Sequence, residues 1–233
     1  MARKARAKPS RPSKAARPSK AARPSSATPK DRIIDALMAL LATREFAKVG
    51  LADIAERADV SLSALREAYD GKLAIVADFS RRIDQAVLDG GPAEGETARD
   101  RLFEILMRRF DALGPYKSAV RGLARAARRD LCLGRALHKI SRRSQGWMFA
   151  AAGAEMAGPL RAIAVEGLVL VNAEALRTFL DDDDPGLAKT MAALDRGLAR
   201  GVRAMSFLDE VCERLRPFVS RDRATRGRAA ARG

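Results

Sequence analysis

"LADIAERADVSLSALREAYDGK", residues 51–72, contains two short segments whose apolar residues recur at helical spacing. The segments are 51–58 and 62–69, and only three residues separate them, so the two helices must meet through a tight turn. Ser61 is well placed to cap the second helix. The side chains that would form a small core between the helices are Ile54, Ala55, Ala58, Val60 and Leu65. The stretch therefore predicts a helix-turn-helix, in which the second helix can enter the major groove of DNA.

Helical spacing of apolar residues continues on both sides of this stretch. Asp31 favours a helix start, since an acidic side chain stabilises the first turn. No segment shows sustained period-two alternation with β-branched residues, so we expect no sheet and an all-α fold. The further ranges that we predict to be helical are 31–46, 72–88, 97–113, 116–131, 135–152, 159–180 and 184–215.

The positive charge of the chain is concentrated near its two ends. The net charge is +15 over 233 residues, but residues 1–30 hold ten Lys or Arg and no acid, and residues 221–233 hold five Arg and one Asp. These two segments carry +10 and +4, which leaves +1 for the residues between them. The helical part is therefore nearly neutral.

The N-terminal segment contains a six-residue repeat, "RPSKAA RPSKAA RPSSAT", at 11–28. Each unit contains proline and little that can be buried, so we expect residues 1–30 to be disordered, and residues 217–233 likewise. Disordered basic segments bind the phosphates of nucleic acids through counterion release. A solubilising role, mitochondrial-type targeting and binding to an anionic membrane surface use the same charge and remain alternatives.

We therefore divide the chain into four parts. A basic tail at 1–30 precedes a helix-turn-helix DNA-binding domain at 31–75. A helical effector-binding and dimerisation domain follows at 76–216, and a second basic tail occupies 217–233.

The residue types that usually carry catalysis or metal binding are sparse. Cys132 and Cys212 lie far apart and His138 is the single histidine, which excludes a zinc finger or a disulfide framework and fits a reducing cytoplasm. There is no Gly-rich phosphate loop, and the consecutive aspartates at 181–184 are typical of a solvated corner. The longest apolar stretch, 167–173, is far shorter than the ~20 residues that span a membrane. We expect a cytoplasmic protein that does not span a membrane, is not an enzyme, and uses no cofactor or metal.

The order of the N-terminal motifs resembles that of the TetR family of transcriptional regulators. The motifs are "RIIDALMALLA" at 32–42, "LADIAERADVS" at 51–61 and "GKLAIV" at 71–76, and the resemblance covers roughly 31–80. It implies an N-terminal domain that binds double-stranded operator DNA as a homodimer, middle helices that enclose an effector pocket, and two long final helices that form the dimer interface.

The resemblance implies DNA contacts for several positions of the helix-turn-helix. Lys72 falls where the family has a phosphate-contacting lysine, Gly50 stands where a threonine is usual, and Arg66 replaces a characteristic tyrosine. Arg66 can donate to guanine edges, or can simply solvate an exposed helix face. The residues that we predict to contact DNA are Gly50, Ser61, Leu62, Ser63, Arg66, Tyr69 and Lys72.

A second resemblance covers "ALREAYDGKLAIVADFSRRIDQAVL" at 64–88 and "GLVLVNAEALRTFLDDDDPGLAKTMAALDR" at 167–196. Both segments are similar to the COQ9-like proteins of ubiquinone biosynthesis, which share the TetR fold. That resemblance implies an accessory protein that binds lipid or isoprenoid. The basic tails are not explained by it.

The middle and final helices suggest an effector pocket and a dimer interface. The ranges 159–180 and 184–215 carry more apolar surface than one core face requires, so we expect them to pair with a second copy in a two-fold homodimer. A small apolar effector would bind among large side chains of the middle helices, although such residues are also typical of an ordinary core. The candidates for that pocket are Phe103, Met107, Phe110, Trp147 and Met148.

Overall fold

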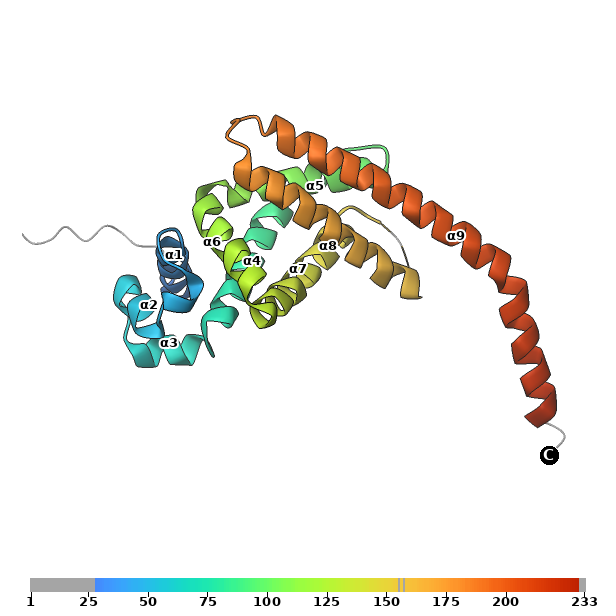
Figure 1. The fold of residues 1–233 in the computed structure, drawn as a ribbon, viewed down its shortest axis with the longest axis horizontal. Coiled ribbons are helices and arrows are strands. Elements are labelled where there is room, and N and C mark those ends of the chain that lie inside the picture. Colours follow the sequence, from blue (N-terminus) through green and yellow to red (C-terminus); the bar gives the residue numbers. More distant parts are fainter. Residues whose placement is uncertain (1–27, 155, 157, 231–233) are drawn as a thin grey trace, which may run out of the picture.

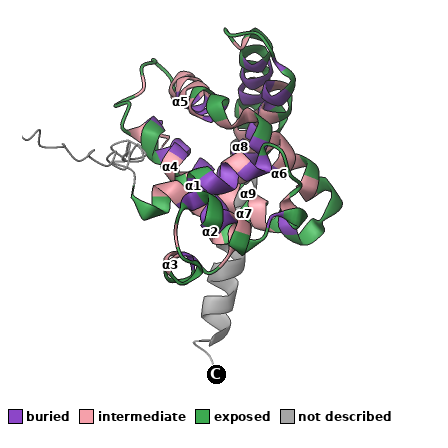
Figure 2. Ribbon diagram, turned by 90° about the vertical axis from the view of Figure 1, so that its left-hand side faces the viewer, coloured by how far each residue is buried: buried purple, intermediate pink, exposed green. Residues whose placement is uncertain are grey.

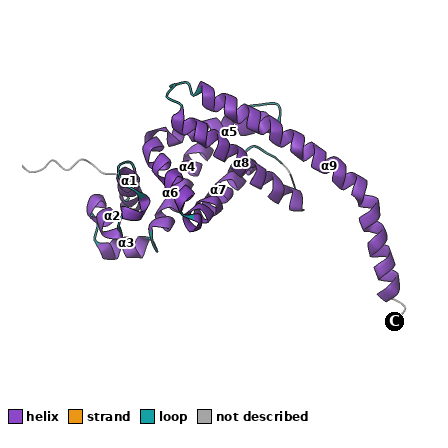
Figure 3. Cartoon of the chain, in the orientation of Figure 1, coloured by secondary structure: helices purple, strands orange, loops and turns teal. Residues whose placement is uncertain are grey.

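The computed structural model describes residues 28–154, 156 and 158–230, with side chains up to 210 except that of 209. These residues form helices and no strand, as the all-α prediction requires (Figure 3). Nine α-helices are present in this part of the chain: α1 (Pro29–Leu41), α2 (Leu51–Ala58), α3 (Leu62–Ala68), α4 (Lys72–Leu88), α5 (Ala98–Leu113), α6 (Lys117–Arg129), α7 (Leu131–Ala151), α8 (Gly158–Asp181) and α9 (Ala188–Ala230). Two 3-10 turns, Phe46–Lys48 and Gly114–Tyr116, precede α2 and α6. None of the described helices is long and apolar enough to cross a membrane.

The first three helices form a head at one end of the molecule (Figure 1). Thr28 caps α1: its hydroxyl accepts from the amide of Asp31, whose carboxylate in turn accepts from the amide of Thr28. Pro29 fits the first turn, where no intrahelical amide is needed. The predicted packing residues of the helix-turn-helix are confirmed, because Ile54, Ala55, Ala58 and Leu65 are buried.

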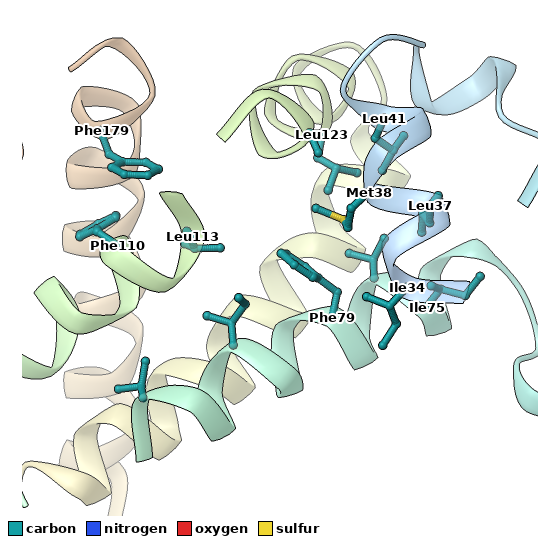
Figure 4. Packing of buried hydrophobic residues seen from close by; sticks show 14 of the residues in the cluster. Ile34, Leu37, Met38, Leu41, Ile75, Phe79, Phe110, Leu113, Leu123 and Phe179 are labelled. Atoms are coloured by element: carbon teal, nitrogen blue, oxygen red, sulfur yellow. The ribbon is translucent and has the colours of Figure 1, made fainter. Parts of the chain in front are cut away.

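α1 joins the head to the rest of the molecule. It packs against α2, α4 and α6, and much of it is buried (Figure 2). Its apolar face meets Ile75 and Phe79 of α4 and Leu123 of α6; the α1 side chains in this contact are Ile34, Leu37, Met38 and Leu41 (Figure 4). At Gly122 the backbones are so close that an added Cβ would lie 2.9 Å from the carbonyl oxygen of Leu41. A rigid contact between α1 and α6 therefore fixes the position of the head.

A buried polar cluster lies where α4, α5 and α7 meet. Arg109 of α5 donates to the Asp84 carboxylate of α4, and the Ser144 hydroxyl of α7 donates to the same oxygen at 2.6 Å. All three residues are less than a tenth exposed. A buried charge is tolerated when it is paired and hydrogen-bonded, so this cluster fixes how α4, α5 and α7 meet.

α8 and α9 form a tightly packed pair. An added Cβ at Gly197 of α9 would lie 2.7 Å from a methyl carbon of Val171 in α8. The corner at 181–184 is solvated only in part: Asp182 is 1% exposed, and it accepts from the amide and the hydroxyl of Thr190 at 2.9 and 2.8 Å. This carboxylate caps the start of α9, whereas the other three aspartates of the corner are exposed, as the prediction of a solvated corner requires.

Several predicted helix limits were wrong, and the largest differences concern α1, α9 and the start of α7, which lies at Leu131 rather than 135. α1 ends at Leu41 rather than 46, because residues 42–50 turn back and form the 3-10 turn that leads into α2. α9 begins at Ala188 rather than 184 and continues to Ala230, through most of the segment 217–233 that we expected to be disordered. That segment is rich in Ala and Arg, which are strong helix formers. The predicted disorder of residues 1–27 concerns a segment outside the described residues.

Candidate DNA-binding surface

α3 presents one face to solvent and the other to the head. Leu65 anchors the inner face, whereas Ser63 and Arg66 are exposed and Leu62 is 54% exposed. The Ser61 hydroxyl caps the helix by accepting from the amide of Ala64 at 3.1 Å and lies 2.9 Å from the Ser63 hydroxyl. The outer face therefore offers two hydroxyls, one apolar side chain, one guanidinium and the exposed carboxylate of Glu67 on a helix of the kind that enters a major groove.

Arg66 is held by a partner that it can leave. Its Nη1 donates to the Asp70 carboxylate one turn further along the chain at 2.7 Å. Both side chains are exposed, at 71% and 91%, so opening this pair costs only about 0.2–1 kcal/mol. Arg66 is therefore available to a base edge or a phosphate.

The start of α2 is less suited to phosphate than the resemblance implies. Gly50 supplies no hydroxyl, and its amide donates to the Asp53 carboxylate at 2.8 Å. Amides at a helix N-terminus are the groups that would bind a phosphate. Here an acidic side chain of the same helix already occupies one of them.

Tyr69 is a structural residue of the head. It is 7% exposed, and its hydroxyl donates to the Asp78 carboxylate of α4 at 2.6 Å. Burial and the bond to Asp78 raise the pKa of Tyr69 above its ordinary value. Tyr69 therefore ties the end of α3 to α4 and has little surface left for DNA, contrary to the contact that we predicted.

Lys72 also acts within the protein. Its ammonium donates to the carbonyl oxygens of Phe46 and Val49 at 2.8 and 2.7 Å and lies 4.5 Å from the centre of the Phe46 ring. Burial lowers the pKa of Lys72. The lysine at the start of α4 thus holds the turn that precedes α2, rather than standing free for a phosphate as the family pattern implies.

The charge of the head itself is slightly unfavourable for DNA. Residues 29–72 contain seven Lys or Arg and eight Asp or Glu. Non-specific attraction to DNA requires excess positive charge. The ten basic residues at 1–30 are the nearest source of that charge in the sequence.

The residues predicted for an apolar effector pocket divide between the hydrophobic core and a surface groove. Phe110 and Met148 are fully buried in the core, and Phe103 and Met107 are half-buried against it. Phe110 packs on Phe179 of α8 with 5.2 Å between ring centres. Four of the five candidates therefore belong to the packing of the described helices.

Trp147 instead lines a groove of about 920 Å³ between α4 and α7. One wall is α4 with Ala77 and Arg81, and the other is α7 with Lys139, Arg143 and Trp147. We call this feature the α4–α7 groove. Its lining mixes charges, alcohols and apolar groups. The sequence alone does not reveal the groove, because its walls are about sixty residues apart in the chain.

Potential metal ligands are dispersed over the described residues, and the single histidine contacts a neighbouring helix. No three His, Cys, Asp or Glu side chains lie together as a metal site within the described residues. His138 of α7 pairs with Glu166 of α8 at 2.8 Å. This contact links α7 to α8.

Solved structures with the same arrangement of helices are TetR-type regulators. A TetR transcriptional regulator from Nitrosomonas europaea superposes with a TM-score of 0.58 at 21% identity, covering 74% of this chain and 97% of that one. A TetR transcriptional regulator from Rhodococcus sp. RHA1 gives a TM-score of 0.54 at 18% identity, covering 73% and 93%. The chain has a TetR fold. A TetR-family regulator from Streptomyces coelicolor gives 0.53 at 16% identity, over 83% of this chain and 89% of that one.

The other comparisons add no closer relative. No protein-family model and no curated protein matches the sequence. The resemblance to COQ9-like proteins receives no support from the TetR-fold structures above, all of which are regulators.

Proposed function

We propose that this chain is a DNA-binding transcriptional regulator, and specifically a repressor that acts as a homodimer. The observation that carries the proposal is the outer face of α3, where Ser63 and Arg66 are exposed on a helix-turn-helix whose packing is complete. The TetR fold of the chain, shared with proteins described as transcriptional regulators, supports the same function.

Recognition divides between α3 and the basic N-terminal segment. Arg66 leaves Asp70 and donates to guanine in the major groove, a contact worth about 1–3 kcal/mol of discrimination. Leu62 can contact a thymine methyl group, and Ser63 can bond to a base or a phosphate. Since the head carries no excess positive charge, residues 1–30 supply most of the attraction to phosphate.

Dimerisation uses α8 and α9. Large apolar side chains are exposed on both helices, including Ile163 at 47% and Leu170 at 66% on α8. On α9, Val202 is 48% and Phe207 65% exposed. Residues seven apart on α8 lie on the same face, so Ile163 and Leu170 form one apolar strip. Burial of such a strip on a two-fold axis would place two α3 helices for a palindromic operator.

Release from DNA follows from binding of a small effector to one of two dimer shapes. The head is joined to the rest of the molecule, which we call the body (α4–α9), through α4 and through the contact of α1 with α6. A shift of these helices therefore changes the spacing of the two heads in the proposed dimer. An effector that binds the non-reading shape more tightly lowers DNA affinity by its difference in affinity for the two shapes.

The experiment is selection of genomic DNA fragments by the purified full-length chain. We expect enrichment of fragments that share a short palindromic sequence. The Arg57→Ala protein is a control that should retain the enrichment, because Arg57 lies on α2 and not on α3, the helix that we propose reads the bases. Retention of fragments without any shared sequence would contradict the proposed function and would indicate binding through the basic segments alone.

A further inference from the structure

The α4–α7 groove carries more positive charge than its own carboxylates neutralise. Of its two carboxylates, Asp84 is paired with the buried Arg109, and Asp78 accepts from Arg81 and from Tyr69. The structure shows no acidic partner for the other basic side chains of the groove within the described residues; they are Lys30, Lys139 and Arg143. Three cations around one groove repel one another, and an anionic ligand would relieve that repulsion.

The basic side chains share the groove with an exposed aromatic ring. Lys139, Arg143 and Trp147 lie four residues apart along α7, so they form one stripe along the helix. Trp147 is 58% exposed although it is the largest apolar side chain of the helix. On the facing wall, the small residues Ala74 and Ala77 leave the space next to this stripe open. A flat ring can stack on Trp147 while its charged group meets Arg143.

The base of the groove is polar and rigid. Ser144 and Asp84 line it, and both belong to the buried cluster with Arg109. Such a fixed base does not collapse when the groove is empty, which lowers the cost of binding a ligand.

We propose that the α4–α7 groove is a binding site for a planar aromatic carboxylate. The ring stacks on Trp147, and the carboxylate accepts from Arg143 and Lys139. The basic segment of this chain at 1–27 is not the occupant, because it contains no acid and the groove would repel it.

The groove also touches the head. Tyr69 at the end of α3 and Lys30 at the start of α1 line it, opposite α7 of the body. A bound ligand therefore contacts the head and the body at once. If the chain is the regulator proposed above, such a ligand is its effector; the binding itself does not depend on that function.

The test uses the full-length protein without DNA. The chain has one tryptophan, so the indole N–H signal in a ¹H–¹⁵N spectrum reports on Trp147 alone. The probes are 2-naphthoate and its uncharged match 2-naphthamide. We expect 2-naphthoate to shift the indole signal saturably and to bind about tenfold more tightly than 2-naphthamide, because only the carboxylate forms charge-assisted bonds.

Charge variants on α7 separate the groove from the rest of the surface. Arg143→Glu should weaken 2-naphthoate binding about tenfold or more and leave 2-naphthamide unchanged. Arg135→Glu is the matched control, because Arg135 is exposed on the same helix and does not line the groove. Calorimetry gives the affinities, and thermal melting confirms that both variants are folded.

Three results would overturn the proposal: equal binding of the two probes, no indole shift at saturation, or equal weakening by Arg143→Glu and Arg135→Glu. These readouts contain no DNA, so they can fail while the chain still selects operator fragments. Conversely, a chain that binds 2-naphthoate but selects no shared DNA sequence refutes the regulator and retains the site.

Discussion

The ammonium of Lys72 lies 2.7 Å from the carbonyl oxygen of Val49 and joins the start of α4 to the turn that precedes α2. The same ammonium donates to the carbonyl oxygen of Phe46. A single side chain thus links the head to α4, the helix that leads to the rest of the molecule.

Replacement of Lys72 by methionine should therefore destabilise the protein before it affects any DNA contact. Lys72→Met keeps the length of the side chain but leaves the two carbonyl groups without this donor, at a cost of about 2 kcal/mol. Urea unfolding of the full-length protein measures this loss. Lys48→Met is the control, because Lys48 is exposed and pairs with the exposed Glu45. The stability of this variant should be nearly the same as that of wild type. Equal stability of Lys72→Met and wild type would refute the structural role.

Gly122→Ala should disturb the contact between α1 and α6. The new Cβ would meet the backbone oxygen of Leu41 at 2.9 Å, and backbone cannot move aside cheaply. We expect a loss of about 1–3 kcal/mol, measured by thermal melting, together with weaker DNA binding. Gly146→Ala is the matched variant on α7: nothing lies within 4 Å of its new Cβ, so it should stabilise the helix by about 0.5–1 kcal/mol. A harmless Gly122→Ala would show that α1 and α6 are not in rigid contact.

Tyr69→Phe tests whether this tyrosine stabilises the head or contacts DNA. Removal of the hydroxyl leaves Asp78 with Arg81 alone and should cost about 1 kcal/mol at pH 8, with the preference among DNA sites unchanged. The folded pKa of Tyr69 is raised above its ordinary 10.0, so its stabilising effect is complete below pH 10 and is lost as the pH rises toward the folded pKa. The difference in urea midpoint between wild type and Tyr69→Phe should therefore shrink above pH 10. A difference that grows there, or an altered site preference, would contradict the assignment.

Leu170→Glu should convert the proposed homodimer into monomers. Leu170 is 66% exposed on α8, and a charge there would be buried without a partner at the proposed interface. Light scattering after size-exclusion chromatography should give twice the 25.2 kDa chain mass for wild type and the single mass for the variant. Leu131→Glu is the control, because Leu131 is 88% exposed at the start of α7 and is not part of the proposed interface of α8 and α9. This variant should remain a dimer. A wild-type monomer would refute the interface.

The sequence predicted the helices and the core of the head because both depend on local spacing. Ile54, Ala58 and Leu65 lie within twelve residues of each other, and their pattern alone requires them to meet in a tight turn. The exposed positions of α3, including Ser63 and Arg66, follow from the same periodicity. These are the parts of the candidate site that could be predicted.

The parts that could not be predicted depend on contacts between distant segments. Lys72 looks like a phosphate contact until the fold places Phe46 and Val49 beside it. Apolar side chains of the middle helices fit a pocket or a core equally well, and packing against α8 decided for Phe110. The α4–α7 groove forms only where α4 and α7, which are distant in the sequence, pack together.

We propose above that α3 reads the DNA sequence through Arg66. The measurement is the ratio of affinities for the selected operator and for an unrelated duplex of equal length, at one fixed salt concentration, for wild type, Arg66→Ala and Arg57→Ala. We predict that Arg66→Ala lowers this ratio about tenfold whereas Arg57→Ala leaves it unchanged, because of these two arginines only Arg66 lies on the exposed face of α3 that we propose reads the bases. An equal ratio for wild type and Arg66→Ala would contradict the account and would leave DNA binding to the basic segments.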